Sequence, residues 1–159
     1  MMTTETVARE WVESVLEQHR HLQAVVADLE IFLDEPRPRT GVKGSHSWAV
    51  ELSQRLLSLH DEFFRHFRFE EETDAMAEML ESHPEAAFKL KEVLDEHPEM
   101  LSQLRRIVSD VLSYSEGVRP EDPKIRRRLN DLLGAFRRHE EEENHLFQRL
   151  EYRDLGAAD

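Results

Sequence analysis

The chain has 159 residues, no cysteine, and 34 acidic against 21 basic residues, which gives a formal net charge of −13 at pH 7. The lack of thiols excludes disulfides, thiol catalysis and cysteine-ligated metal sites, and the negative charge argues against nucleic acid and anionic membranes as partners. No apolar run approaches the ~20 residues of a membrane span, and no N-terminal segment has the pattern of a secretory signal. We therefore expect a single cytoplasmic domain over residues 1–159, large enough to bury its own core.

The first third of the chain predicts one long helix. Few glycines and prolines, together with 35% charged residues, are typical of helices with solvated outer faces. Apolar residues recur at three- and four-residue steps from about Glu5 to just before Pro36, which indicates a helix with one buried face. The segment 35–44 carries two prolines and two glycines, and so predicts a loop.

Two further helices are expected in the middle of the chain. A second apolar stripe predicts a helix from Ser45 or Ser47 to about Leu80. Pro84 then stands at the first position of a third helix, where its missing N–H costs least. Pro98 falls inside this third helix and removes one of its hydrogen bonds, so we expect a kink or a local break there.

A fourth helix is expected near the C-terminus. The loop 116–123 contains a glycine and two prolines and ends the third helix. Beyond it, apolar residues at helical spacing run from Ile125 to Leu150. We expect the tail after Tyr152 to be frayed.

The two halves of the chain repeat one pattern. Segment 14–19, Ser-Val-Leu-Glu-Gln-His, matches segment 92–97, Glu-Val-Leu-Asp-Glu-His, and a Phe-x-Arg-His-x-x-x-Glu motif begins at Phe63 and again at Phe136. Two related helical hairpins whose apolar stripes need cover predict an all-α fold, an antiparallel up-down-up-down four-helix bundle. The hairpins are expected at residues 5–80 and 84–152.

Each copy of the second motif places a histidine four residues before a glutamate. Four residues of α-helix turn about 400° and rise about 6 Å, so both side chains stand on one face and can reach the same metal ion. Two more histidines lie in the inward-facing stripes of the first and third helices. Six inward side chains are therefore expected to meet: His19, His66, Glu70, His97, His139 and Glu143.

This set of donors predicts a metal site. Burying imidazoles and carboxylates without compensation costs several kcal/mol per charged group, and a metal supplies that compensation. Imidazole suits iron, copper, nickel and zinc, whereas a carboxylate is a hard ligand that can bridge two ions. Two histidines per ion and two shared glutamates leave coordination positions open, which suits redox chemistry with small oxygen species. Zinc is redox-inert, so iron is our first expectation and manganese the second.

The order of these six residues resembles the hemerythrin-like, or HHE cation-binding, domain family. The resemblance covers residues 7–150 and implies a four-helix bundle around an oxo- or hydroxo-bridged pair of iron ions. It also implies a role for each ligand. The implied assignments are Glu70 and Glu143 as bridges, His19 with His66 on one iron, and His97 with His139 on the other.

The sequence departs from the oxygen-carrying hemerythrins, which use five histidines and an aspartate bridge. Here the positions four residues either side of His97 are Val93 and Leu101, and the fourth-helix bridge is Glu143. Two nearly equivalent irons do not favour reversible binding of O₂ at one of them. Proteins that resemble this four-histidine, two-glutamate pattern include peroxide-decomposing proteins, so we predict catalase-like decomposition of hydrogen peroxide.

Other functions stay open at this level. The first is a non-enzymatic module that binds O₂, nitric oxide or iron and reports its state to a partner. The second is a structural bundle with a vacant or zinc-filled site. A ferritin-like oxidase would need Glu-x-x-His on two helices, and the pattern occurs only in 142–145. The chain is expected to be a monomer or a dimer.

The remaining polar residues are expected to have ordinary roles. In the acidic runs 70–72 and 140–143, only the glutamate four residues after each histidine is singled out, and the others are expected on solvated faces. Tyr114 and Tyr152 are expected to pack in the bundle, and His60 is the outlying histidine best placed to support the site. The histidines expected at the surface or as helix caps are His21, His46, His60, His83 and His145.

Overall fold

A computed structural model describes residues 4–36, 41–71, 74–118 and 120–157. Within these ranges the chain forms six α-helices and no strand. Their bounds are Thr4–Asp34 (α1), Gly41–Glu71 (α2), Ala75–Ser82 (α3), Pro84–Leu94 (α4), His97–Ser115 (α5) and Ile125–Ala157 (α6).

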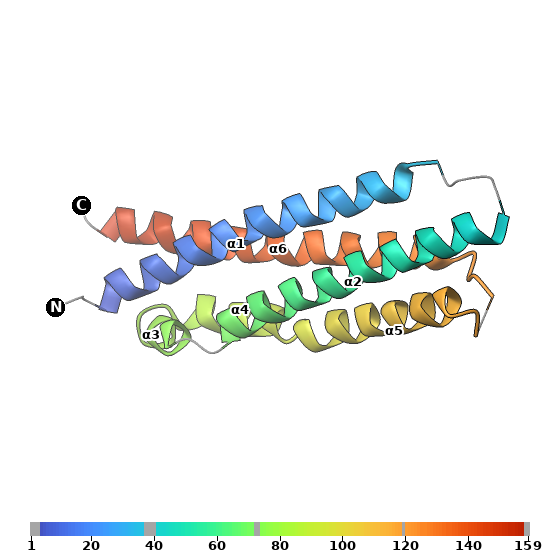
Figure 1. The fold of residues 1–159 in the computed structure, drawn as a ribbon. Coiled ribbons are helices and arrows are strands. Elements are labelled where there is room, and N and C mark those ends of the chain that lie inside the picture. The colour runs from blue at the N-terminus through green and yellow to red at the C-terminus, as the bar shows by residue number, and fades with distance from the viewer. Residues whose placement is uncertain (1–3, 37–40, 72–73, 119, 158–159) are drawn as a thin grey trace.

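Four long rods, formed by α1, α2, α4 with α5, and α6, lie side by side and alternate in direction (Figure 1). Contacts join α1 to α2 and α6, and α5 to the same two helices, so the rods close into a ring around one interior. The predicted all-α, four-helix bundle is confirmed. None of the helices in the described ranges is long and apolar enough to cross a membrane.

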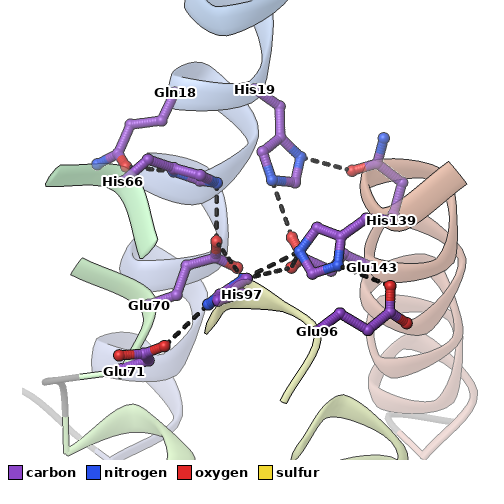
Figure 2. Close-up of polar contacts among 10 residues, drawn as sticks. Gln18, His19, His66, Glu70, Glu71, Glu96, His97, His139 and Glu143 are labelled. Atoms are coloured by element: carbon purple, nitrogen blue, oxygen red, sulfur yellow. Dashed lines mark hydrogen bonds and ion pairs between the residues drawn. The ribbon is translucent and has the colours of Figure 1, made fainter. Parts of the chain in front are cut away.

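The third rod is broken between α4 and α5. Pro98 lacks the N–H that a continuous helix would use, and the backbone adapts by a tighter turn in which the Glu96 N–H bonds to the Val93 carbonyl at 3.1 Å. Helix α5 then resumes at His97 with the proline in its first turn. The predicted break is confirmed, and it places His97 at a bend of the backbone that faces the other rods (Figure 2).

The second rod ends earlier than predicted. The structure stops α2 at Glu71 and folds 75–82 into the separate helix α3, so the predicted continuous helix to Leu80 is wrong. Helix α3 lies across the end of the bundle, where Figure 1 shows it nearly end-on, and it contacts α1 and α4. This turn buries Met79 in a cluster with Trp11 and Leu90, which a straight continuation would not cover.

Two other boundaries also differ from the prediction. Helix α2 begins at Gly41 and so includes the end of the predicted loop 35–44, of which 37–40 lie outside the described residues. Helix α6 continues to Ala157, beyond the predicted end at Leu150 and into the tail that was expected to fray after Tyr152. Both predicted boundaries rested on weak local sequence signals, and helix ends are the positions that such signals locate least precisely.

The buried apolar side chains of the described ranges form two clusters. The larger cluster contains the stacked rings of Phe63 and Phe136, whose centroids are 4.3 Å apart. The smaller cluster contains Trp11 and Phe147, with ring centroids 5.6 Å apart. Along α1, along the broken rod and along α6, the expected ligand positions fall between these two clusters. The bundle therefore carries a polar layer across an otherwise apolar interior.

Candidate metal centre

All six predicted ligand residues meet in this polar layer (Figure 2). The four rods supply them, one histidine from each of α1 and α5 and a His-x-x-x-Glu pair from each of α2 and α6. Their side chains are between 0% and 3% exposed. The buried set is His19, His66, Glu70, His97, His139 and Glu143.

The two helical pairs adopt the geometry that their spacing predicts. On α2, His66 Nε2 lies 2.8 Å from Glu70 Oε1. On α6, His139 Nε2 lies 2.6 Å from Glu143 Oε1. Because residues four apart stand on one helix face, α2 and α6 each present a nitrogen and an oxygen donor close together.

Contacts between rods join these pairs. His19 Nε2 lies 2.9 Å from Glu143 Oε2, and His97 Nε2 lies 3.7 Å from Glu70 Oε1 and 3.8 Å from Glu143 Oε1. The donors fall into two groups, each with its ligand atoms within 4.8 Å of one another. The groups are His19, His66, Glu70 and Glu143, and then Glu70, His97, His139 and Glu143.

Both glutamates belong to both groups, whereas each histidine belongs to one. We name the histidine pairs by their first members: the His19 half holds His19 and His66, and the His97 half holds His97 and His139. The two rings are 4.9 Å apart between centroids in the first half and 4.8 Å in the second. The layer is thus organised as two similar halves that share two carboxylates.

The outer ring nitrogens of the four histidines face a second set of polar groups. His19 Nδ1 donates to Asn144 Oδ1 at 3.0 Å, and His66 Nδ1 donates to Gln18 Oε1 at 2.7 Å. In the other half, His97 Nδ1 donates to Glu71 Oε1 at 2.9 Å. Glu96 Oε2 lies 3.5 Å from His139 Nδ1, which is a longer electrostatic contact.

These outer contacts determine which nitrogen carries the proton. Amide and carboxylate oxygens only accept, so the Nδ1 atoms of His19, His66 and His97 hold the hydrogen, whereas His139 Nδ1 has no hydrogen-bond partner among the described residues. The Nε2 atoms are then left with lone pairs that point to the centre of the layer. Ligand histidines in metalloproteins are oriented in this way, with the far ring nitrogen donating to an oxygen.

The donor set fits a metal pair. Among the described residues, Nε2 of His19 and His66 and both carboxylate oxygens of Glu70 and Glu143 have no hydrogen-bond partner. In the other half, the Nε2 atoms of His97 and His139 face each other at 3.0 Å. Donors about 2.1 Å from one ion stand about 3 to 4 Å apart, close to the spacing found here. Buried lone pairs that converge without hydrogens between them are what a cation requires.

Burial and mutual charge separate the pKa values of the two glutamates in the metal-free chain. Burial and the neighbouring charge of Glu143 raise the pKa of Glu70 well above its usual value. Burial would also raise the pKa of Glu143, but the favourable interactions of its carboxylate with His139, His19 and His97 outweigh burial and hold that pKa well below its usual value. The Glu70 and Glu143 carboxylates have oxygens within 4.8 Å of one another. Two carboxylates this close cannot both ionise without a large cost in free energy unless a positive charge lies between them.

The histidines show the same competition. Burial would lower the pKa of His19, but the Glu143 carboxylate, 2.9 Å from His19 Nε2, outweighs burial, and the pKa is raised. For His66, burial and the nearby ring of His19 lower the pKa to about 3. His66 is therefore neutral over the physiological range, the state in which imidazole binds a metal.

One aromatic ring borders the layer on the side of the larger apolar cluster. Phe67 stacks on His97 with centroids 3.8 Å apart and an interplanar angle of 6°. The same ring lies 5.8 Å from His66 and 5.9 Å from His139 between centroids. It is 1% exposed, so it closes the polar layer against the apolar interior and limits the rotation of the ring on which it stacks.

The expectation for the acidic run on α6 was partly wrong. Glu140 was expected on a solvated face, but it is 1% exposed and accepts a hydrogen bond from the amide of Gln23 at 3.2 Å. Burial raises its pKa. Glu141 and Glu142 are exposed, as expected.

The outer partners of the histidines were not predicted from the sequence. Each is the immediate chain neighbour of a ligand, but it contacts a histidine of a different rod. A polar residue next to each predicted ligand was the available signal, and it went unused because helical spacing alone sends such a neighbour to another face. The missed residues are Gln18, Glu71, Glu96 and Asn144.

The remaining expectations have mixed outcomes. His60 lies beside Asp61 and stacks on Phe64, and its described contacts give no support to its expected role beside the site. Tyr114 packs against the larger apolar cluster, as expected. The side chains of Tyr152 and His46 lie outside the described part of the chain.

Comparisons with known proteins agree with this geometry. The family model of the hemerythrin HHE cation-binding domain matches residues 12–157. No curated protein and no solved structure gives a significant match. The matched region includes all six converging residues and nearly the whole bundle. The chain therefore belongs to the hemerythrin HHE cation-binding domain family.

Proposed function

We propose that this protein binds two iron ions in the polar layer and decomposes hydrogen peroxide. The observation that carries the proposal is the division of the six donors into two groups of four that share both glutamates. Two histidines and two shared carboxylates occupy only part of the coordination sphere of each ion, so positions stay open for a small oxygen species. Mixed nitrogen and oxygen donors favour iron over calcium or magnesium.

A bound iron pair would supply redox centres that take up and return the two electrons exchanged between two peroxide molecules. The overall reaction converts two hydrogen peroxide molecules into two waters and one O₂. The protein's part would be positional: Glu70 and Glu143 would each contribute to holding both ions, and three of the four histidines keep their Nε2 atoms directed inward through their outer hydrogen bonds. Preorganised donors of this kind need little rearrangement during turnover.

Burial of the layer supports a small substrate. The six ligand side chains are 0–3% exposed, and Phe67 and the apolar clusters flank them. An organic substrate of several heavy atoms would need the rods to separate, whereas peroxide is close to water in size. The enclosure thus favours peroxide, O₂ or nitric oxide over larger substrates.

The test is peroxide consumption by protein of defined iron content. Metal-free protein is loaded with ferrous iron, passed through a desalting column and assayed for bound iron, peroxide loss and O₂ release. We expect two irons per chain and one O₂ for every two peroxide molecules consumed. Zinc-loaded protein is the matched control and should be inactive, because zinc has no accessible redox change. A manganese-loaded sample tests the second choice of metal.

Ligand variants separate a bound centre from stray iron. Glu70→Ala and Glu143→Ala each remove a shared carboxylate, so we expect both to lose the second iron and the peroxide activity. Retention of two irons per chain in both variants would contradict the bridging assignment. Two bound irons with a stable coloured O₂ adduct and no peroxide loss would favour the alternative, a non-enzymatic O₂, nitric oxide or iron-binding module.

A further inference from the structure

The outer partners of the four histidines occupy matching positions in the two halves of the repeat. Gln18 precedes His19 as Glu96 precedes His97, and the segments that contain them align. Asn144 follows the glutamate of the second His-x-x-x-Glu motif as Glu71 follows the glutamate of the first. The halves are thus related position by position, in the outer contacts as well as in the ligands.

At both matching positions the two halves differ in charge. The His19 half is backed by two neutral amides, Asn144 and Gln18, at 3.0 and 2.7 Å. The His97 half faces two carboxylates, Glu71 at 2.9 Å and Glu96 at 3.5 Å. Gln18 and Glu96 have nearly the same shape, whereas Asn144 is one methylene shorter than Glu71. Both positions keep an oxygen next to the ring nitrogen and change the charge.

Such a difference acts directly on the donor strength of the rings. A carboxylate that accepts from Nδ1 pulls the proton outward and makes Nε2 a stronger donor to a cation, more so than a neutral amide does. Its negative charge also attracts the cation through the ring. Both effects have the same sign. The hydrogen-bond effect acts only on the His97 half, through Glu71, because the two ligand glutamates are shared and the buried Glu140 near His19 bonds to Gln23 and not to a ligand ring. The charge effect of Glu71 and Glu96 adds to it in the same half.

We infer that the two halves of the centre bind cations with unequal affinity, and that a divalent cation occupies the His97 half first because Glu71 and Glu96 back its histidines. This inference rests on the proposed metal function. It assigns Glu71, Glu96, Gln18 and Asn144 as positioning residues that set the order of filling. Loss of such outer partners typically changes metal affinity 10- to 100-fold, so the two affinities are expected to differ by about that factor.

The test follows zinc binding to the metal-free protein. Zinc is diamagnetic and redox-inert, so the imidazole nitrogen signals of each histidine are recorded by long-range ¹H–¹⁵N NMR during the titration, with assignments from single-histidine variants. We expect the first equivalent to move the signals of His97 and His139, and the second equivalent to move those of His19 and His66. Calorimetry should resolve two steps with affinities about 10- to 100-fold apart.

Isosteric variants are then expected to equalise the zinc affinities of the two halves or to reverse their order of filling. Glu71→Gln with Glu96→Gln makes all outer partners neutral, and we expect the two steps to merge. Adding Gln18→Glu and Asn144→Asp to this pair exchanges the charges, and the His19 half should fill first. The matched control is Glu141→Gln with Glu142→Gln, which removes the same charge from the exposed face of α6 and should leave the order unchanged.

The outcomes separate this inference from the proposed function. Simultaneous filling in the unmodified protein, or an order that the Glu71 and Glu96 variants do not change, overturns the inference alone, whatever the peroxide assay shows. Failure of zinc to bind at the four histidines overturns both. If a multiple variant does not fold, as judged by circular dichroism, Glu96→Gln and Gln18→Glu singly should still narrow the gap between the two affinities.

Discussion

The polar layer and the larger apolar cluster next to it are buried to the same degree, but they act on stability in opposite ways. Phe63 and Leu104 in the cluster are 0% exposed, and so are Glu70 and Glu143 in the layer. Burial of the apolar side chains stabilises the fold by roughly 1.5–3 kcal/mol each. Burial of the carboxylates costs free energy unless a cation compensates them.

The difference shows how the bundle separates folding from chemistry. The two apolar clusters hold the rods together from both sides, so the layer between them can keep converging donors with buried atoms that have no hydrogen-bond partner among the described residues. The free-energy cost of burying the carboxylates is lowest when a cation is bound, so the stability of the fold depends on its metal content. Four changes test this contrast between layer and cluster, and their expected effects decrease in the order given.

The largest effect is expected inside the apolar cluster. Phe63→Ala removes a fully buried ring that stacks on Phe136 and should lower the free energy of unfolding by about 3–5 kcal/mol, with or without metal, because it leaves a cavity. Urea unfolding followed by circular dichroism measures it. Phe64→Ala, one residue along and 40% exposed, is the control and should cost about 1 kcal/mol or less. Equal losses would mean that the cluster does not carry the stability.

The second effect comes from metal binding to the layer. Zinc or ferrous iron at 100 times its dissociation constant should raise the free energy of unfolding by about 2.7 kcal/mol for one site. Paired urea titrations of metal-free and loaded protein measure the gain. Glu143→Ala should lose most of it, because this carboxylate belongs to both donor groups. An unchanged gain in that variant would show that the cation binds elsewhere.

The third effect is a pH dependence in the metal-free protein. Because the pKa of Glu70 is raised in the folded state, the native chain holds a proton that the unfolded chain releases, so stability falls as pH rises above the unfolded value. Glu70→Gln removes this group. The stability of the variant relative to the unmodified chain should rise as the pH increases above the usual glutamate pKa of about 4.3, by at most about 1.4 kcal/mol over one pH unit. A difference that does not vary with pH would contradict the raised pKa.

The smallest effect lies outside both regions. Glu51→Ala breaks an exposed ion pair with Arg55, whose charged atoms are 3.1 Å apart on one face of α2. Solvent screens such pairs, so the expected loss is about 0.5 kcal/mol or less, and it should shrink further in high salt. The measurement gives the background against which the other three effects are judged. A loss as large as that of Phe63→Ala would show that the burial of a side chain does not determine how much its removal destabilises the fold.

Much of the fold followed from local patterns, and the failures lie where packing decides. The apolar spacing predicted the four rods, and Pro98 predicted the break that precedes α5. The end of α2 was predicted wrongly, because nothing near Glu71 terminates a helix as strongly as the burial of Met79 against α1 and α4 does. Helix propensity is a weak constraint that tertiary burial overrides.

The candidate site was predictable in part for the same reason. Histidine and glutamate four residues apart in a repeated motif must share a helix face, so the repeated spacing was enough to predict the convergence of six donors. That these residues bind iron, and that the whole chain acts as one cytoplasmic domain, stay predictions. The burial of Glu140 was missed because it depends on where α1 brings Gln23.

The order of residues along the chain fixes which side chains share a helix face, because the periodicity of the helix is a local property of the backbone. That order is enough to define the four rods and the identity of the converging donors. Which rod each neighbouring polar residue contacts is set by the packing of the bundle, since it depends on how the helices are rotated against one another. The division of the layer into an amide-backed half and a carboxylate-backed half is therefore a property of the packed bundle.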